Sequence, residues 1–324
     1  DINGDTQFLQ LGTGPVTLNA GSLVLRGNGG ADFVTIVTGD GVTGNSVLLN
    51  ASSTLNIGRY NGTRTNNTFR LGGLTIGNHT LTLTVANKYR AAFAGPITLT
   101  GNATFSTALD DTSSWLALEG PMTDNGNGYG FTKLGLGSLL LSGDSSFSGT
   151  NIFGNLAANT AGPGSTTATA GTSGFVVLGH NNALGSSLII ERGLQIRASV
   201  PGLVIPNNVV ITNGGFRFGG TNSIAFSGTF TLISAARDIG NYSADQTLTI
   251  NNIDLNGQSA TFVGTAGAAT NGPTIVRGCI SNSKATGSVY AKTAFCNARL
   301  ILAGANTYTN NTVIEPQAAI QLGD

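Results

Sequence analysis

The sequence has few charged residues and few of the residues that favour helices. Asp, Glu, Lys and Arg make up 9% of the chain, and its 324 residues include four Lys, three Glu and one Met. Lys, Glu and Met are strong helix formers. Gly, Asn, Ser and Thr instead lose backbone entropy in a helix or compete for its hydrogen bonds, and the chain has 48, 33, 25 and 42 of them. This composition excludes a mainly helical protein and favours strands and turns, while a hydrophobic share of 40% argues against disorder.

Net charge and hydropathy exclude two classes of partner. Fifteen basic and fifteen acidic residues cancel, so the sequence lacks the positive footprint of nucleic-acid-binding proteins. The longest apolar runs, such as 188–190 and 203–205, are a few residues long, whereas a membrane helix needs about 20. We therefore expect no nucleic-acid partner and no membrane span. Residues 1–30 lack the charged start and apolar run of a secretory signal, so we expect a mature or excised segment.

The sequence has only two cysteines, Cys279 and Cys296. Neither belongs to a C-x-x-C pair, and the two histidines, His79 and His180, lie far away in the sequence, which argues against a zinc cluster. A disulfide and two free thiols both remain open, and an oxidising compartment would favour the disulfide. In a fold built from stacked strands, the Cα atoms of neighbouring positions lie about 4.8 Å apart, which is within the Cα–Cα range that a disulfide tolerates. Our hypothesis is that Cys279 and Cys296 form a disulfide that links neighbouring coils.

A short pattern of apolar and polar residues recurs along the chain. Residues 16–25, VTLNAGSLVL, place apolar residues at alternate positions on both sides of a turn, and residues 209–218, VVITNGGFRF, repeat that arrangement. Residues 188–196 repeat it with one residue fewer, and 97–105 and 248–255 carry looser versions. Such alternation is typical of a strand with one buried face. Each unit is thus predicted to be a strand, a corner and another strand.

These short units cannot bury an apolar face alone, so neighbouring copies must stack. The spacing between the turn glycines Gly193 and Gly214 suits one coil of a three-sided solenoid. The sequence therefore predicts an all-β fold, a single-stranded right-handed parallel β-helix (β-solenoid), elongated and with exposed loop excursions. Segments 157–174 and 264–273 have no core-facing pattern and are the predicted excursions.

A longer repeat is superimposed on the short one. Segment 134–153 parallels 295–314, so that LLLSG at 139–143 matches LILAG at 300–304, and 93–99 resembles 226–232. Two related blocks, approximately 93–190 and 226–324, would therefore build most of the chain. No linker separates independent domains, so residues 1–324 are expected to form one continuous β-solenoid.

Three segments resemble the autotransporter-associated β-strand repeats: LILAGANTYTNNTVIEPQAAIQLGD at 300–324, KLGLGSLLLSGDSSFSG at 133–149 and VVLGHNNALGSSLII at 176–190. The resemblance covers about two thirds of the chain and is strongest at 300–324. That family occurs in bacterial secreted and surface proteins, including autotransporter passengers, and folds as a parallel β-helix. The resemblance implies an extracellular or bacterial cell-surface location, and its motifs are specific for a fold rather than for an activity.

Candidate catalytic residues are few. Parallel β-helices also house polysaccharide-degrading enzymes, whose sites need clustered carboxylates, often with His or Arg, on successive coils. Asp110 and Asp111 are adjacent, so on a strand they would point to opposite faces, and their flanking residues favour a solvated corner. Asp124, in DNGNGYG, and His180, in GHNNALG, are interpreted as turn residues. We therefore predict no catalytic residue and no enzyme.

Metal sites are weakly indicated. GNGGADFVT at 27–35 fits a relaxed calcium nonapeptide with Asp32 as ligand, but no second copy follows one unit later, so a turn followed by a strand is the better interpretation. Asp1, Asn3 and Asp5 have the spacing of a calcium loop, but Thr6 replaces its essential Gly. We predict no metal and no cofactor. Seven N-x-[ST] sequons match the number expected by chance and indicate no glycosylation: Asn50, Asn61, Asn66, Asn78, Asn102, Asn241 and Asn310.

The predicted body is a spacer or scaffold, and the two ends suggest how it assembles. Residues 320–323, IQLG, repeat 9–12, LQLG, and neither end carries a charged or helical cap of the kind that solenoids need. We expect an extracellular structural protein of a bacterial surface or secreted fibre, stacking end to end with further copies. Two alternatives are that the coils continue in a longer chain, and that the segment is an adhesin or passenger stalk that binds a surface or a glycan.

Overall fold

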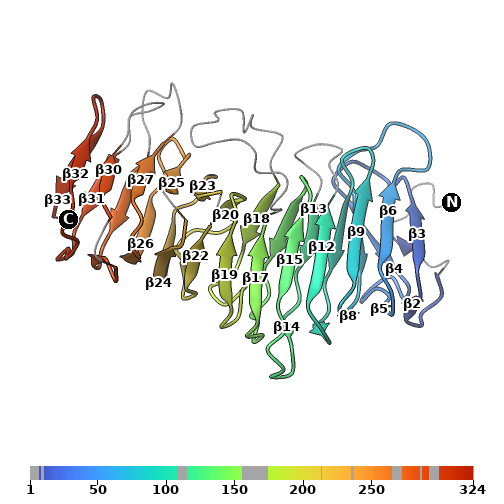
Figure 1. The fold of residues 1–324 in the computed structure, drawn as a ribbon. Helices are drawn as coiled ribbons and strands as arrows, with labels where there is room; N and C mark the ends of the chain where they lie inside the picture. The colour runs from blue at the N-terminus through green and yellow to red at the C-terminus, as the bar shows by residue number, and fades with distance from the viewer. Residues whose placement is uncertain are drawn as a thin grey trace. The chain divides into compact units, whose positions relative to one another are not determined.

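A computed structural model describes residues 7–8, 11–107, 115–154, 174–212, 214–234, 237–264, 272–284, 287–291 and 299–323. Throughout this part of the chain the regular structure is β-strand, without an α-helix, and no helix is long and apolar enough to cross a membrane. The strands pair in parallel and stack as coils, which confirms the predicted all-β parallel β-solenoid (Figure 1).

The described residues fall into two compact units. The N-terminal unit contains the described residues up to Asn151 together with 174–176 and 182–186, and the C-terminal unit contains 152–154, 177–181 and those from Ser187 onward. Strands β17 (Thr150–Phe153) and β18 (Phe175–Leu178) contribute residues to both. One continuous solenoid with blocks 93–190 and 226–324 stays a prediction.

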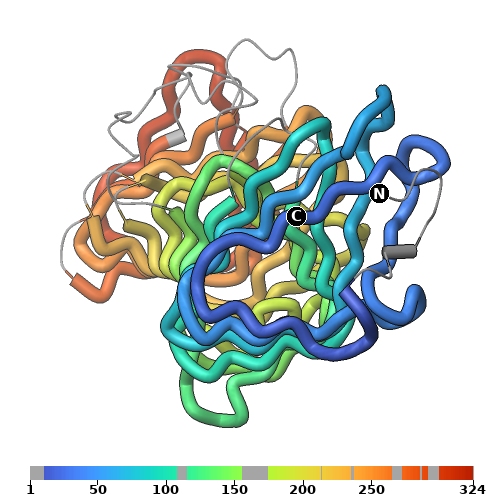
Figure 2. The backbone as a smooth tube through the Cα atoms, turned by 90° about the vertical axis from the view of Figure 1, so that its right-hand side faces the viewer, coloured from blue at the N-terminus to red at the C-terminus, as the bar shows by residue number. Residues whose placement is uncertain are grey.

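The N-terminal unit repeats three strands per coil, each pairing with its counterpart in the next coil. The first ladder is β1 (Gln7–Phe8), β4 (Thr35–Thr38), β7 (Thr68–Leu71), β10 (Arg90–Phe93), β13 (Trp115–Leu118) and β16 (Ser138–Leu141). The second is β2 (Val16–Leu18), β5 (Val47–Leu49), β8 (Leu74–Ile76), β11 (Ile97–Leu99) and β14 (Met122–Thr123). The third is β3 (Gly21–Arg26), β6 (Ser53–Gly58), β9 (Thr80–Val85), β12 (Ala103–Thr107) and β15 (Phe131–Leu134). Viewed from the N-terminal end, its first coils wind around a common interior (Figure 2).

Equivalent side chains of successive coils build the core of this unit. Val47, Leu74 and Ile97 occupy one register position and are at most 3% exposed. Phe105 of β12 and Phe131 of β15 meet diagonally across these paired strands, with ring centroids 5.6 Å apart. Burying each such side chain contributes roughly 1.5–3 kcal/mol to stability. The alternation that the sequence shows is therefore the pattern of a dry interior.

The C-terminal unit also has three ladders, two of which share long strands. One is β20 (Gln195–Ala198), β23 (Phe216–Phe218), β25 (Arg237–Asn241), β27 (Ala260–Val263), β30 (Val289–Ala291) and β32 (Thr312–Ile314). The other strands are β19 (Leu188–Glu191), β21 (Leu203–Ile205), β22 (Val209–Ile211), β24 (Ile224–Leu232), β26 (Leu248–Asp254), β28 (Thr274–Val276), β29 (Ile280–Ser281), β31 (Arg299–Leu302) and β33 (Ala319–Leu322). The first half of β24 pairs with β21 and its second half with β22, across a register shift between Phe226 and Thr229.

Side chains at the corners explain the abundance of Asn and Gly. The Asn102 amide oxygen accepts a hydrogen bond from the backbone N–H of Gly130, 28 residues away on the next coil, at 3.0 Å. Equivalent inter-coil bonds involve Asn45, Asn78 and Asn151 in the N-terminal unit, and Asn181, Asn208, Asn252 and Asn306 in the C-terminal unit. A Cβ at Gly120 would collide with the Gly95 carbonyl oxygen, so only glycine lets these two corners stack.

The predicted strand pairs can now be compared with the structure. Residues 16–25, 188–196, 97–105 and 209–218 each form two strands around a corner, as predicted. Residues 248–255 do not, because β26 runs unbroken through the expected corner, although its two halves pair with different strands. Coil length varies, since the step from Val16 to its partner Val47 is longer than the step from Ile189 to Val209. The predicted loops 157–174 and 264–273 lie largely outside the described residues.

Candidate functional site

Asp124 is a structural carboxylate, as the sequence predicted for a turn residue. It is 1% exposed, and Oδ1 accepts a hydrogen bond from the N–H of Gly126 at 2.9 Å. Oδ2 accepts hydrogen bonds from Gly128, Tyr129 and Ser148 at 2.8–3.2 Å. Burial by itself would raise the pKa of Asp124, but the hydrogen bonds outweigh it and hold the pKa below 3.8. The carboxylate thus organises its loop.

Among the other predicted candidates, those that the structure describes do not come together as a site. Asp110 and Asp111 lie outside the described residues, as do Asp1, Asn3 and Asp5. Asp32 lies in a turn directly before β4, and its Oδ1 accepts a hydrogen bond from the N–H of Thr65 at 2.9 Å, so the predicted turn and strand are confirmed. His180 is half-buried in a bend after β18. No group of three or more metal-ligating side chains occurs within the described residues.

Cys296, the predicted disulfide partner of Cys279, lies outside the described residues. Cys279, just before β29, is a half-buried free thiol among those that are described. Its sulfur lies 3.4 Å from the Thr307 hydroxyl of the next coil. The pairing of Cys279 with Cys296 therefore stays a prediction.

The N-terminal unit ends in a strand edge. Among the described residues, β2 and β3 are the first strands of their ladders, and each pairs with another strand on one side. Leu23 of β3 is half-buried, whereas its partner Leu55 in the next coil is 2% exposed. The only charge on the two strands is Arg26, and its guanidinium bends back to donate hydrogen bonds to Leu25 and Asn56. A lysine or proline that would block edge-to-edge pairing is absent from these strands.

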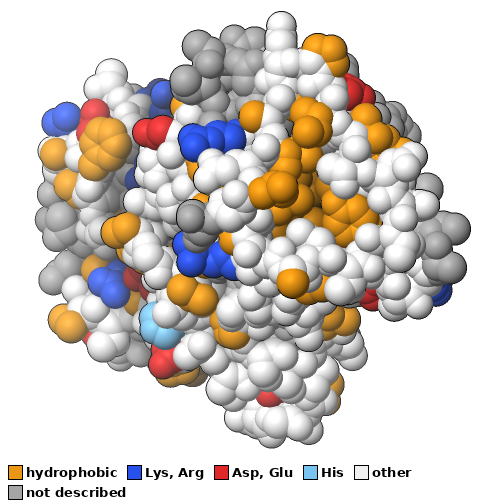
Figure 3. Space-filling view, turned by 90° about the vertical axis from the view of Figure 1, so that its left-hand side faces the viewer, with side chains coloured by type: hydrophobic (Ala, Val, Ile, Leu, Met, Phe, Trp, Pro, Cys, Tyr) orange, Lys and Arg blue, Asp and Glu red, His pale blue; other side chains and the backbone are white. Residues whose placement is uncertain are grey.

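The C-terminal unit ends in a second strand edge, formed by β32 and β33. Ile320 and Leu322 stack on Leu300 and Leu302, and Leu322 is 79% exposed. Ile314 of β32 is 54% exposed. Figure 3 shows hydrophobic side chains gathered on this end. Neither strand carries a charged residue or a proline.

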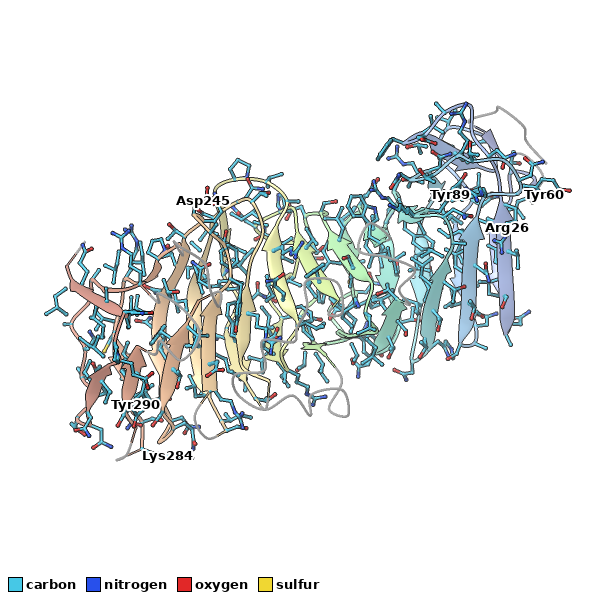
Figure 4. The ribbon with its side chains drawn as sticks, turned by 90° about the horizontal axis from the view of Figure 1, so that it is seen from above. Arg26, Tyr60, Tyr89, Asp245, Lys284 and Tyr290 are labelled. Atoms are coloured by element: carbon cyan, nitrogen blue, oxygen red, sulfur yellow. The ribbon has the colours of Figure 1, made fainter. Side chains whose placement is uncertain are left out.

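Three stacked loops of the N-terminal unit form a second candidate feature, which we call the loop cluster: 27–34, 59–67 and 86–89. Its base is a buried polar network around Asn67, Tyr89 and Asn28, which are 0%, 0% and 3% exposed. The Tyr89 hydroxyl donates to the Gly27 carbonyl at 2.8 Å and accepts from the Asn67 amide at 3.2 Å. Burial raises the pKa of Tyr89 above 10.0, so its hydroxyl stays protonated. Figure 4 shows Tyr89 within the loops and Tyr60 pointing away from them.

The corners of the loop cluster share an unusual backbone. Phe33, Asn66 and Lys88 have φ of 62°, 63° and 63°, and the N–H of Phe33 donates to the Thr65 carbonyl at 3.3 Å. Asn tolerates this left-handed region, whereas a bulky residue such as Phe is strained there. Phe33 is nevertheless 70% exposed. Burial of the Phe33 ring therefore offsets little of the backbone strain at this residue.

Two ionisable side chains point into the interior. Lys133 on β15 is 0% exposed, and its Nζ donates to the carbonyls of Leu134 and Gly135 at 2.6 and 3.0 Å. Burial lowers its pKa from 10.5 to about 7. Glu191 on β19 is 0% exposed and accepts a hydrogen bond from Gly193 N–H at 2.7 Å. Burial raises its pKa well above 4.5 despite backbone hydrogen bonds.

Sequence reasoning missed the loop cluster and both buried charges. The pattern at 27–35 draws attention to Asp32 as a metal ligand and gives no weight to the aromatic residue beside it. The segment GRYNGTR at 58–64 carried a usable signal. It places an aromatic residue and two arginines in one loop of a chain with only 9% charged residues. The comparisons give no further guide, since the chain matches no protein-family model, no curated protein and no solved structure.

Proposed function

We propose that this chain is a structural segment of a bacterial surface or secreted fibre and that its coils continue into a second copy. The observation that carries the proposal is the pair of uncapped strand edges. At one edge Leu23 and Leu25 of β3 are inward-facing and two residues apart, and at the other Ile320 and Leu322 of β33, the last strand of the same ladder, have the same spacing. Because the coils stack in parallel, one edge can add to the other without reversing direction.

The contact would be head-to-tail and not self-complementary. Such a contact does not close on itself, and repetition of it produces a filament. Hydrophobic burial would drive it, since covering a leucine such as Leu322 contributes about 1.5–3 kcal/mol. The low charge of the chain limits repulsion between copies. The extracellular location rests on the resemblance to autotransporter-associated repeats. Continuation of the coils in a longer chain would use the same edges.

Light scattering after gel filtration, combined with electron microscopy, tests this proposal. The purified protein is expected to form rods that lengthen with concentration. Leu322→Lys places a charge at the edge and should leave monomers, whereas Leu48→Lys, the same change at an outward position of β5, should not. Monomers at every concentration would contradict end-to-end assembly, as would unchanged rods in Leu322→Lys.

The second candidate function is an adhesin or passenger stalk. It requires a surface that binds a ligand, and the exposed side chains of the loop cluster are the feature that favours it. Phe33 and Tyr60 are 70% and 59% exposed on loops fixed from beneath by Asn67 and Tyr89.

A further inference from the structure

The outer side of the loop cluster presents two aromatic rings. Phe33 and Tyr60 are the only exposed aromatic side chains among the described residues, and they are 70% and 59% exposed. They come from adjacent loops, which are joined by hydrogen bonds from Phe33 N–H to Thr65 and from Tyr60 N–H to the Asn28 side chain. Figure 4 shows Tyr60 at the periphery of the loops. Both rings are therefore exposed to solvent on adjacent loops that are hydrogen-bonded to each other.

Folding does not explain Phe33. A bulky residue at φ 62° is strained, and an exposed ring recovers little of that strain by burial. Asn occupies the equivalent corner in the next loop, Asn66, at φ 63° without this penalty. Strain of this kind is commonly found at binding sites. A ligand that covers the ring would supply the missing stabilisation.

The loops are preorganised for binding. Thr65 N–H is fixed by the Asp32 carboxylate at 2.9 Å, and the Asn28 amide oxygen accepts from the N–H groups of Tyr60 and Asn61 at 3.1 and 3.0 Å. Beneath them, Asn67 donates to the Asn28 carbonyl at 2.7 Å. Fixing the loops before the ligand arrives lowers the entropy cost of binding.

The surface is also positively charged. Arg64 is exposed and Arg59 is half-buried, and the Arg59 guanidinium lies 3.5 Å from the Arg64 carbonyl, so both belong to the same loop structure. Asp32 is the acidic residue of these two loops, and one of its oxygens already accepts from Thr65. Arginine pairs with carboxylates through two parallel hydrogen bonds. A ligand that carries carboxylates would match this surface.

We propose that the outer side of the loop cluster binds an acidic polysaccharide. The apolar faces of its sugar rings would stack on Phe33 and Tyr60, and its carboxylates would pair with Arg59 and Arg64. Asn61 would bond to hydroxyl groups. A nucleic acid is disfavoured because strong, salt-dependent binding rests on about 6–10 phosphate contacts, whereas the loop cluster offers three basic side chains, Arg59, Arg64 and Lys88, and the chain has no net charge. The inference rests on the second candidate function and does not require end-to-end assembly.

Calorimetric titration with oligogalacturonate tests the site, with dextran and single-stranded DNA as comparison ligands. The protein should bind oligogalacturonate, with affinity that falls as salt rises, and should bind dextran and DNA more weakly. Tyr60→Ala and Arg64→Gln should each weaken binding about tenfold or more, the loss expected when a stacked ring or a charge-assisted hydrogen bond is removed. Val42→Ala, an equally exposed apolar position outside the cluster, should bind normally.

Phe33→Asn separates binding from folding. It should raise the unfolding midpoint by relieving backbone strain while weakening oligogalacturonate binding, whereas a purely structural Phe33 would lower the midpoint. Leu322→Lys should bind normally even if it abolishes rods, so failure of assembly and failure of this site are distinguishable. The proposal is overturned if the wild-type protein does not bind oligogalacturonate, if it prefers DNA, or if the loop variants bind unchanged.

Discussion

Lys133 makes the stability of this protein depend on alkaline pH in a calculable way. The side chain is fully buried and its pKa is lowered from 10.5 to about 7 by burial. An unfolded chain releases this proton near pH 10.5, so between pH 7 and 10.5 the unfolded state holds more protons than the folded state. The contribution of Lys133 to the free energy of unfolding must therefore rise with pH across that window.

The size of the effect follows from the shift of the pKa. The two values differ by roughly 3.5 units, and each unit corresponds to about 1.4 kcal/mol, so the ionised lysine costs the folded state about 5 kcal/mol relative to the neutral one. Lys133→Met removes the charge and keeps the chain length. It also leaves the carbonyls of Leu134 and Gly135 without their donor, which costs about 1–3 kcal/mol each at every pH. The test is therefore how the stability difference between wild type and Lys133→Met changes with pH, and not the size of that difference at one pH.

Guanidinium unfolding of wild type and Lys133→Met at several pH values between 6 and 10.5 measures that slope. The stability of the variant relative to wild type should fall by about 1.4 kcal/mol per pH unit between pH 7 and 10.5. Lys88→Met, a change of the same kind at an exposed corner, is the matched control for the substitution itself. A difference between Lys133→Met and wild type that is constant over this range would refute a buried lysine with a lowered pKa.

Three further predictions concern buried polar groups. Burial raises the pKa of Glu191, so the contribution of Glu191 to stability should fall as pH rises above 4.5. Glu191→Gln should remove this contribution, whose slope is up to about 1.4 kcal/mol per pH unit, and equal slopes for wild type and variant in urea unfolding would contradict this. Asp124→Ala deprives the loop N–H groups of their acceptor and should cost about 2–4 kcal/mol at pH 7. Because the pKa of Asp124 is lowered, that cost should shrink as pH falls below 3.8, and a loss unchanged at low pH would count against it. Tyr89→Phe should lower stability by about 1–3 kcal/mol without pH dependence below pH 9, and a neutral effect in thermal unfolding would show that the buried network contributes little.

Some of the candidate sites could be predicted from sequence patterns, and others could not. Asp124 could be predicted as a turn residue because Asp followed by Asn-Gly is a local turn signal. The IQLG segment at 320–323 overlaps the edge strand β33, whereas LQLG at 9–12 precedes β2 and β3 and lies partly outside the described residues, so the predicted match of the two ends stays a prediction. The loop cluster could not be predicted, because residues 27–34 and 59–67 meet only when the coils stack, and no local signal marks a phenylalanine in the left-handed region.

The sequence by itself determined the strands, their inward faces and the need to stack, since alternation and turn residues act over a few neighbouring positions. Only the tertiary structure decided which coils pair, because loop insertions make the step from Val16 to Val47 longer than the step from Ile189 to Val209. It also decided that Lys133 points inward within the pattern of a core strand and that Asn67 closes a network with Tyr89, 22 residues away. Those outcomes depend on contacts between residues that are separated in the sequence and meet only when the coils stack. A local sequence pattern does not encode such contacts.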